Sequence, residues 1–311
     1  MTSPRRVTIS STISFLLVLS RFLTAQQQPD SLKAVRVNGV VLRYTDNGHG
    51  PALVFVHGGM EDYRAWAAQV ALLAKNFRVI AYSRRYNFPN HNPIRTDNYS
   101  AIVDAEDLAA LIRSLKLGRV HMVGHSYGAY IALVLAETHP EMVRSLVLSE
   151  PPLMKWLTDI PNGKPLLDDF MNNMWLPCGQ AFRRDDPEAA LRITVDWFGS
   201  HESPRAGHFS YASLPPDARN YLMQDIREWQ ALTTSHDAFP PLSREQVRQV
   251  RAPALLLSGS RSVPAFRLIA DELARTLPSV QFVVLDGATH EMWSEVPKEL
   301  TQWIRPFLLR N

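Results

Sequence analysis

Short apolar stretches alternate with amphipathic ones along most of this chain. The apolar stretches have the length and composition of buried strands, and they are "PALVFVHGG", "FRVIAYS", "GRVHMVGHS", "VRSLVLSE", "PALLLSG" and "VQFVVLDG". Residues 61–75, 99–115, 127–140 and 265–277 lie between or after them and predict helices. Strands that alternate with helices imply right-handed crossovers, so we expect an α/β fold with a mostly parallel sheet flanked by helices. Such a sheet carries its reactive groups at the carboxyl ends of its strands.

Two segments depart from this alternation. Residues 33–48 predict a hairpin with its turn at Asn38 and Gly39. Prolines, tryptophans and helix-like pieces such as 187–198 and 216–230 replace the strand signals between residues 151 and 251. We therefore expect a core formed by residues 33–150 and 252–311, with residues 151–251 inserted as a helical cap or lid (the helical insertion).

Charge and cysteine content argue against several classes of protein. The 311 residues are 46% hydrophobic, which is ordinary for a soluble globular protein with a sizeable core. Lys and Arg number 33 against 30 Asp and Glu, and a net charge of only +3 provides no basic surface for nucleic acid. The single cysteine, Cys178, cannot form an intramolecular disulfide. No phosphate-binding glycine loop or metal-ligand cluster is recognisable, so we expect no cofactor and no metal.

The first 25 residues have the pattern of a signal peptide. Arg5 and Arg6 precede the apolar run 13–19, and Ala25 stands before the polar "QQQPD". Arg21 interrupts this pattern. We expect cleavage after Ala25 and export to the periplasm or the medium, the alternative being a membrane anchor formed by the uncleaved segment. A stable membrane span needs about 20 apolar residues, which this segment does not supply, so we expect none.

Ser126 lies between Gly124 and Gly128, where a predicted strand becomes a predicted helix. This is the context in which the pattern G-x-S-x-G indicates a nucleophile. The two glycines allow strand and helix to approach closely around a strained turn, and the serine hydroxyl then points into the cleft. The alternative is a glycine-bounded turn with an incidental serine. We predict that Ser126 is the nucleophile.

His290 is the predicted general base. A serine hydroxyl is a weak nucleophile until a base takes its proton, and that base must lie at another strand end. His290 follows the last predicted strand in "LDGATHEMW", and the chain order serine, acid, histidine fits this architecture. The alternative is a surface histidine that caps the last helix.

Together these motifs give the chain a family resemblance. The "HGG" after one strand, Trp66, "GHSYGA" and "DGATHEMWSEVPKEL" resemble the α/β-hydrolase superfamily, in its lidded branch with a helical cap. The resemblance extends from about Lys33 to Leu309. It implies the α/β-hydrolase fold and a cofactor-free hydrolase that acts on a small-molecule substrate.

The acid of the triad departs from the family pattern. Most members carry it three residues beyond the glycine of the strand that here ends "ALLLSG", where this chain has Ser262. Some branches use the end of the preceding strand, which places Glu150 in that role. A carboxylate directly after a buried strand is rarely left unpaired, so we predict Glu150 as the acid. Asp271, in a predicted helix, and Glu202 and Asp237, in the helical insertion, are weaker candidates.

Two backbone N–H groups are needed for an oxyanion hole. Tyr127, directly after the nucleophile, supplies one, and the resemblance points to Gly59 for the other, with Gly58 as the alternative. His57 in the same loop is expected to form structural hydrogen bonds rather than act as a second base. Arg84 and Tyr86 follow the end of another predicted strand. They are expected either at the pocket rim or in a solvated loop.

The helical insertion is expected to cover an apolar pocket. Its large apolar side chains provide either pocket lining or insertion core: Trp156, Met171, Met174, Trp175, Trp197, Phe198, Phe209 and Tyr211. We therefore predict an esterase-like serine hydrolase for a small, largely apolar substrate, acting through an acyl-enzyme. Within enzymes, lactonase, carbon–carbon bond hydrolase and perhydrolase activities fit the same triad. The alternative from another class is a catalytically silent scaffold that binds a ligand or partner.

Overall fold

The computed structural model describes residues 5–8, 32–95, 98–202 and 209–311. Most of the predicted signal peptide, residues 1–25, therefore lies outside the described residues. Its described part, Arg5–Thr8, forms strand β1, which pairs in parallel with β9 (Val280–Asp286) at one edge of the sheet. Cleavage after Ala25 would remove β1 and leave β9 as the edge strand.

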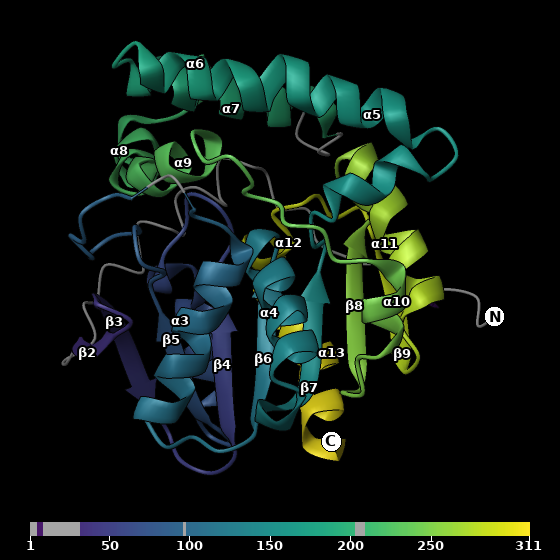
Figure 1. Ribbon diagram of the computed structural model, residues 1–311. Helices are drawn as coiled ribbons and strands as arrows, with labels where there is room; N and C mark the ends of the chain where they lie inside the picture. The colour runs from purple at the N-terminus through teal and green to yellow at the C-terminus, as the bar shows by residue number, and fades with distance from the viewer. Residues whose placement is uncertain (1–4, 9–31, 96–97, 203–208) are drawn as a thin grey trace.

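The described strands form one sheet in the order β1-β9-β8-β7-β6-β4-β5-β3-β2 (Figure 1). The pairings of β2 with β3 and of β3 with β5 are antiparallel, and the other neighbouring pairs of the described chain are parallel. The predicted hairpin is confirmed, with its turn at Asn38 and Gly39, whose φ angles are 45° and 79°. The remaining strands are β2 (Lys33–Val37), β3 (Val40–Asn47), β4 (Ala52–Val56), β5 (Arg78–Tyr82), β6 (Val120–His125), β7 (Val143–Ser149) and β8 (Ala254–Gly259).

Helices cover both faces of this sheet because its central strands are apolar on both. In β4, Val54 and Val56 belong to a core shared with α3 (Ala101–Ser114), α4 (Tyr127–Thr138) and α11 (Pro264–Thr276). The alternate residues Leu53 and Phe55 face a second core shared with α2 (Ala67–Leu73), α12 (Met292–Glu295) and α13 (Pro297–Arg310). Side chains of a strand point alternately to opposite faces, so a continuous apolar run is buried between two helical layers.

The described residues of the helical insertion form helices and loops but no strand, and α5 to α9 lie across one end of the sheet (Figure 1). The expected helix 216–230 is two helices that meet at Asp225, whose buried carboxylate accepts a hydrogen bond from the Phe88 N–H (2.7 Å). The helices of the insertion are η3 (Met154–Thr158), α5 (Gly163–Phe170), the π-helix η4 (Met171–Trp175), α6 (Leu176–Arg183), α7 (Pro187–His201), η5 (Tyr211–Ser213), α8 (Pro216–Gln224), α9 (Ile226–Thr233) and α10 (Arg244–Arg248).

Candidate active site

Ser126 occupies a strained turn between β6 and α4. Its φ and ψ of 50° and −121° lie outside the regions that L-residues normally adopt, and its N–H donates to Ser149 O at 2.8 Å. The flanking glycines are needed for close packing. A Cβ on Gly128 would lie 2.2 Å from Val56 O, and one on Gly124 would lie 2.6 Å from Ala129 Cα. The strand, turn and helix around Ser126 therefore match the expected elbow.

Glu150 follows β7 and is buried among four hydrogen-bond donors. Oε1 accepts from Ser258 Oγ and Gly259 N, both at 2.8 Å. Oε2 accepts from Ser262 Oγ and lies 2.6 Å from His290 Nδ1. Ser262, at the position where the family resemblance leads us to expect the acid, thus donates to the carboxylate that we predict in its place. A buried carboxylate with this set of donors is held in one orientation.

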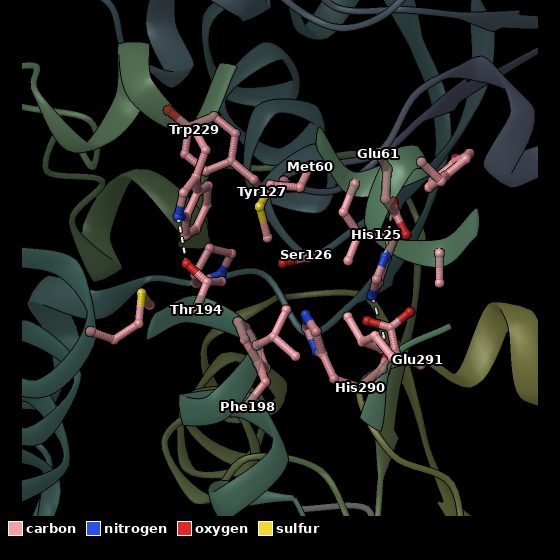
Figure 2. A pocket seen from close by; sticks show the side chains of 18 of the residues that line it. Met60, Glu61, His125, Ser126, Tyr127, Thr194, Phe198, Trp229, His290 and Glu291 are labelled. Atoms are coloured by element: carbon pink, nitrogen blue, oxygen red, sulfur yellow. Dashed lines mark hydrogen bonds and ion pairs between the residues drawn. The ribbon is translucent and has the colours of Figure 1, made fainter. Parts of the chain in front are cut away.

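His290 links the Glu150 carboxylate to the cavity beside Ser126. Its ring packs against those of Phe198 and Phe266, with centroids 5.8 and 4.7 Å away. Burial lowers the pKa of His290 below its ordinary 6.5, although the hydrogen bond with Glu150 opposes this shift. Ser126 and His290 line the same cavity, and the imidazole points toward Ser126 (Figure 2). A neutral imidazole whose Nδ1–H is bonded to a carboxylate presents a basic Nε2 to its surroundings.

The other candidate acids lie elsewhere. Asp271 is exposed on α11, and Asp237 forms an exposed ion pair with Lys155 (3.0 Å). Glu202 is buried and accepts the His290 main-chain N–H at 3.0 Å, so it contacts the backbone of this residue and not its ring. Of these carboxylates, Glu150 is therefore the one bonded to the imidazole.

Of the N–H groups of Gly58, Gly59 and Met60 in the loop after β4, one is left for an oxyanion. Gly58 N donates to Glu61 Oε2 at 2.6 Å, and Met60 N donates to Glu228 Oε2 at 3.0 Å. Gly59 N, between them, has no acceptor among the described residues, and Gly59 lines the cavity. Tyr127, also in the lining, begins α4, and N–H groups in the first turn of a helix have no intrahelical partner. This geometry favours Gly59 over Gly58.

Comparison with known proteins agrees with this geometry. The family model described as "alpha/beta hydrolase fold" matches residues 51–295. The chain belongs to the α/β-hydrolase fold family. As expected, it is a hydrolase of that family with a mostly parallel sheet.

Individual relatives are distant but cover most of the chain. It is 27% identical to the AB hydrolase superfamily protein YfhM of Bacillus subtilis, over 88% of this chain and 96% of that protein. It is 23% identical to mouse epoxide hydrolase 3, over 89% of this chain and 76% of that protein. The structure of the carboxylesterase CesB of Bacillus subtilis superposes with a TM-score of 0.69 at 16% identity, over 96% of this chain and 98% of that chain.

His57 and Arg84 form hydrogen bonds beneath the surface of the cavity in this α/β-hydrolase, with each other and with Gly58. His57 Nε2 accepts the Arg84 main-chain N–H at 3.0 Å, and His57 Nδ1 lies 2.9 Å from Gly58 O. Burial and the nearby Arg84 charge lower the pKa of His57 to about 3, so the ring is neutral. Both ring nitrogens of His57 are therefore in use. Arg84 and Tyr86 are buried and absent from the cavity lining, so neither forms the pocket rim.

His125, directly before Ser126, is a site residue that the sequence did not reveal. Its Nδ1 lies 3.3 Å from Glu61 Oε2, and its Nε2 lies 3.0 Å from His290 O. Both partners accept, so both ring nitrogens must carry hydrogen. Burial alone would lower the pKa of His125, but the Glu61 charge and hydrogen bond raise it to about 9. His125 is therefore an imidazolium at neutral pH.

The cavity beside Ser126 has a volume of about 430 Å³ and is mainly apolar. Of the large apolar side chains of the insertion, for which lining and core were both open, Met174, Trp175, Phe198 and Phe209 line the cavity. Trp156, Met171, Trp197 and Tyr211 do not, and belong to the packing of the insertion. Within the described residues no group of three or more His, Cys, Asp or Glu side chains is arranged so that it could hold a metal ion, and no helix has the length and apolarity to cross a membrane.

Proposed function

We propose that this α/β-hydrolase is a serine hydrolase that cleaves ester-like bonds of a small, largely apolar substrate through an acyl-enzyme. Ser126 is the nucleophile, His290 the general base, and Glu150 the acid that orients the imidazole. The N–H groups of Gly59 and Tyr127 bind the oxyanion. The observation that carries this proposal is the 2.6 Å hydrogen bond between His290 Nδ1 and Glu150 Oε2.

The proposed reaction begins when His290 Nε2 takes the Ser126 proton as Oγ attacks the acyl carbon. The carbonyl oxygen becomes an oxyanion, bound by the two N–H groups. Collapse of this intermediate breaks the bond to the leaving group, which takes the proton from His290. Water, deprotonated by His290, then attacks the acyl-enzyme, and Ser126 Oγ leaves with the proton from His290 as the acid product is released. In each half-reaction the Glu150 carboxylate stabilises the imidazolium.

The cavity supports an apolar acyl substrate. Its volume lies within the range of small-molecule sites, roughly 300–1,000 Å³. Its insertion side is lined by aromatic side chains, among them Phe170, Trp175 and Phe239. Esters and lactones fit this lining, while carbon–carbon bond cleavage and perhydrolysis are further reactions of the same triad. Export after cleavage at Ala25 stays a prediction, which N-terminal sequencing of the protein from the culture medium would test.

Labelling separates this proposal from a catalytically silent scaffold. A fluorophosphonate probe should label the folded wild type and leave Ser126→Ala unlabelled. Glu150→Gln should keep its thermal midpoint near that of wild type but lose a factor on the order of 10³ to 10⁴ in kcat on p-nitrophenyl esters, because the amide cannot stabilise the imidazolium. Absence of labelling in the folded wild type would rule out the serine hydrolase, and full turnover by Glu150→Gln would rule out the acid.

A further inference from the structure

Glu228 of the helical insertion contacts the core loop that carries Gly59. It lies on α9, is fully buried, and accepts the Met60 N–H at Oε2 (3.0 Å). Its Oε1 accepts from Arg84 Nη2 at 2.7 Å. Burying a carboxylate is costly unless it is paired, and both oxygens of Glu228 are paired with core groups. This buried carboxylate therefore ties the insertion to the loop of Gly59.

Arg84 holds the other side of Gly59. Its Nη2 also donates to Gly58 O at 2.9 Å, and its Nη1 donates to Asp104 Oδ2 of α3 at 2.9 Å. The His57 ring donates to the same Gly58 oxygen. Arg84 is completely buried, so water does not compete for these bonds. The guanidinium thus connects the core helix, the loop and the insertion.

These contacts fix both peptide planes around Gly59. The Gly58 carbonyl and the Gly59 N–H share one planar trans peptide, in which they point in opposite directions. Anchoring Gly58 O on Arg84 therefore aims the Gly59 N–H away from it. The Met60 N–H shares the next peptide plane with the Gly59 carbonyl, so the hydrogen bond of Met60 N–H to Glu228 also fixes the orientation of that carbonyl. A flip of the first plane would replace the N–H donor by a carbonyl and repel an oxyanion.

The next residue of α9 covers the same glycine. A Cβ on Gly59 would lie 2.9 Å from Cζ3 of Trp229, so the indole excludes a side chain at this position. The indole is itself held by a hydrogen bond from Nε1 to Thr194 Oγ1 of α7 at 2.8 Å (Figure 2). Two consecutive residues of α9 therefore contact the loop: Glu228 through its carboxylate and Trp229 through its indole ring.

We infer that Glu228 and Arg84 are positioning residues of the oxyanion hole: together they orient the Gly59 N–H, so that this hole is complete only while α9 is docked on the core. This inference rests on the proposed serine hydrolase. It assigns the helical insertion a part in catalysis besides lining the pocket. Because the oxyanion exists only after attack, the contribution belongs to the transition state and not to substrate binding.

The test variant is Glu228→Gln, which keeps the size of the side chain and removes its charge. Direct loss of an oxyanion donor costs about 10²- to 10³-fold in kcat, so a misaligned donor should cost about 10- to 100-fold. KM should stay within about twofold, because substrate binding does not use this donor. A boronic acid that mimics the tetrahedral intermediate should bind weaker by the same factor as kcat. The matched control is Glu188→Gln on α7, an exposed glutamate of the same insertion.

A second variant covers the case in which Glu228→Gln does not fold. Arg84→Met combined with Glu228→Leu and Asp104→Asn removes all three charges of this buried network, so no carboxylate is left without its cation. Exchange of a buried ion network for uncharged side chains often preserves stability. This variant should fold, react slowly with the fluorophosphonate and show the same selective loss of kcat. Wild-type kcat and boronate affinity in either folded variant would overturn the inference. A loss of kcat no larger than the loss of folded protein would overturn it as well. No labelling of the wild type would instead overturn the proposed function.

Discussion

At the scale of single residues, His125 places a positive charge beside the proposed base. Its ring centroid lies 4.7 Å from that of His290, and its cationic form contributes to the lowered pKa of His290. Glu61, Glu150 and Glu291 raise the pKa of His125 and so keep this cation in place. Glu150 and Glu61 also raise the pKa of His290 directly and oppose the effect of His125 there. The charge of Glu61 also acts on Glu291, whose pKa burial and this charge raise to about 7. The protonation of His290 thus depends on a small group of buried and partly buried charges next to Ser126.

His125→Asn should shift the acid limb of the pH–rate profile to higher pH. The pKa of His290 is lowered in the wild type, so its neutral, basic form persists below pH 6.5. Removing the neighbouring cation raises the pKa of His290. At a given acidic pH a larger fraction of His290 is then protonated and cannot act as the base. The measurement is kcat/KM against pH for wild type, His125→Asn and the half-exposed control His139→Gln. An acid limb that stays in place or moves to lower pH would contradict the role given to His125.

At the scale of secondary-structure elements, the junction between β6 and α4 depends on Gly128. The helix packs so tightly on the chain after β4 that a Cβ at this position would lie 2.2 Å from Val56 O and 2.4 Å from His57 O. Both atoms belong to the backbone, so a small side-chain movement cannot relieve the overlap. The same close packing brings the first turn of α4 next to the loop that carries Gly59.

Gly128→Ala should therefore destabilise the fold and displace the elbow. We expect a loss of about 3 kcal/mol or more in the free energy of unfolding, since overpacking against fixed groups costs about this much. Gly118→Ala is the matched control. Its site has φ of 66° but nothing within 4 Å of the new Cβ, so only backbone strain of about 1 to 2 kcal/mol is expected. Urea unfolding measures both values, and equal losses in the two variants would refute the packing argument.

Elements that depend on local sequence could be predicted, and those that depend on distant contacts could not. The apolar runs indicated β4 to β9, and Asn38–Gly39 indicated the first hairpin, because periodicity and turn chemistry are local properties. The break between α8 and α9 involves the contact of Asp225 with Phe88, 137 positions away. The local sequence of residues 216–230 does not indicate that Asp225 will contact Phe88.

At the scale of the whole molecule, the candidate site joins the core to the helical insertion. Ser126, Glu150 and His290 could be proposed from the sequence because each follows a predicted strand, and parallel strands bring their carboxyl ends to one edge. The roles of Glu228 and Trp229 could not, because they depend on how the insertion docks. Neither could the interior position of Arg84, whose partners Asp104 and Glu228 lie 20 and 144 positions away.

The insertion should also set which acyl groups this α/β-hydrolase accepts. Trp175 ends the π-helix η4, lines the cavity, and packs against Trp229 and Phe239 with centroids 5.2 and 4.7 Å away. Trp175→Leu should lengthen the apolar part of the cavity. We expect the ratio of kcat/KM for p-nitrophenyl octanoate over acetate to rise about tenfold, since each accommodated methylene contributes about 1 kcal/mol or more.

Trp197→Leu separates pocket shape from general damage to the insertion. Trp197 is also buried there and packs edge to face on Phe170, but it does not line the cavity. Its loss should lower the thermal midpoint and leave the octanoate-to-acetate ratio near that of wild type. If both tryptophan variants shift the ratio equally, selectivity reflects the stability of the insertion and not the side chains that face Ser126. A shift confined to Trp175→Leu would place the acyl chain of the substrate against η4.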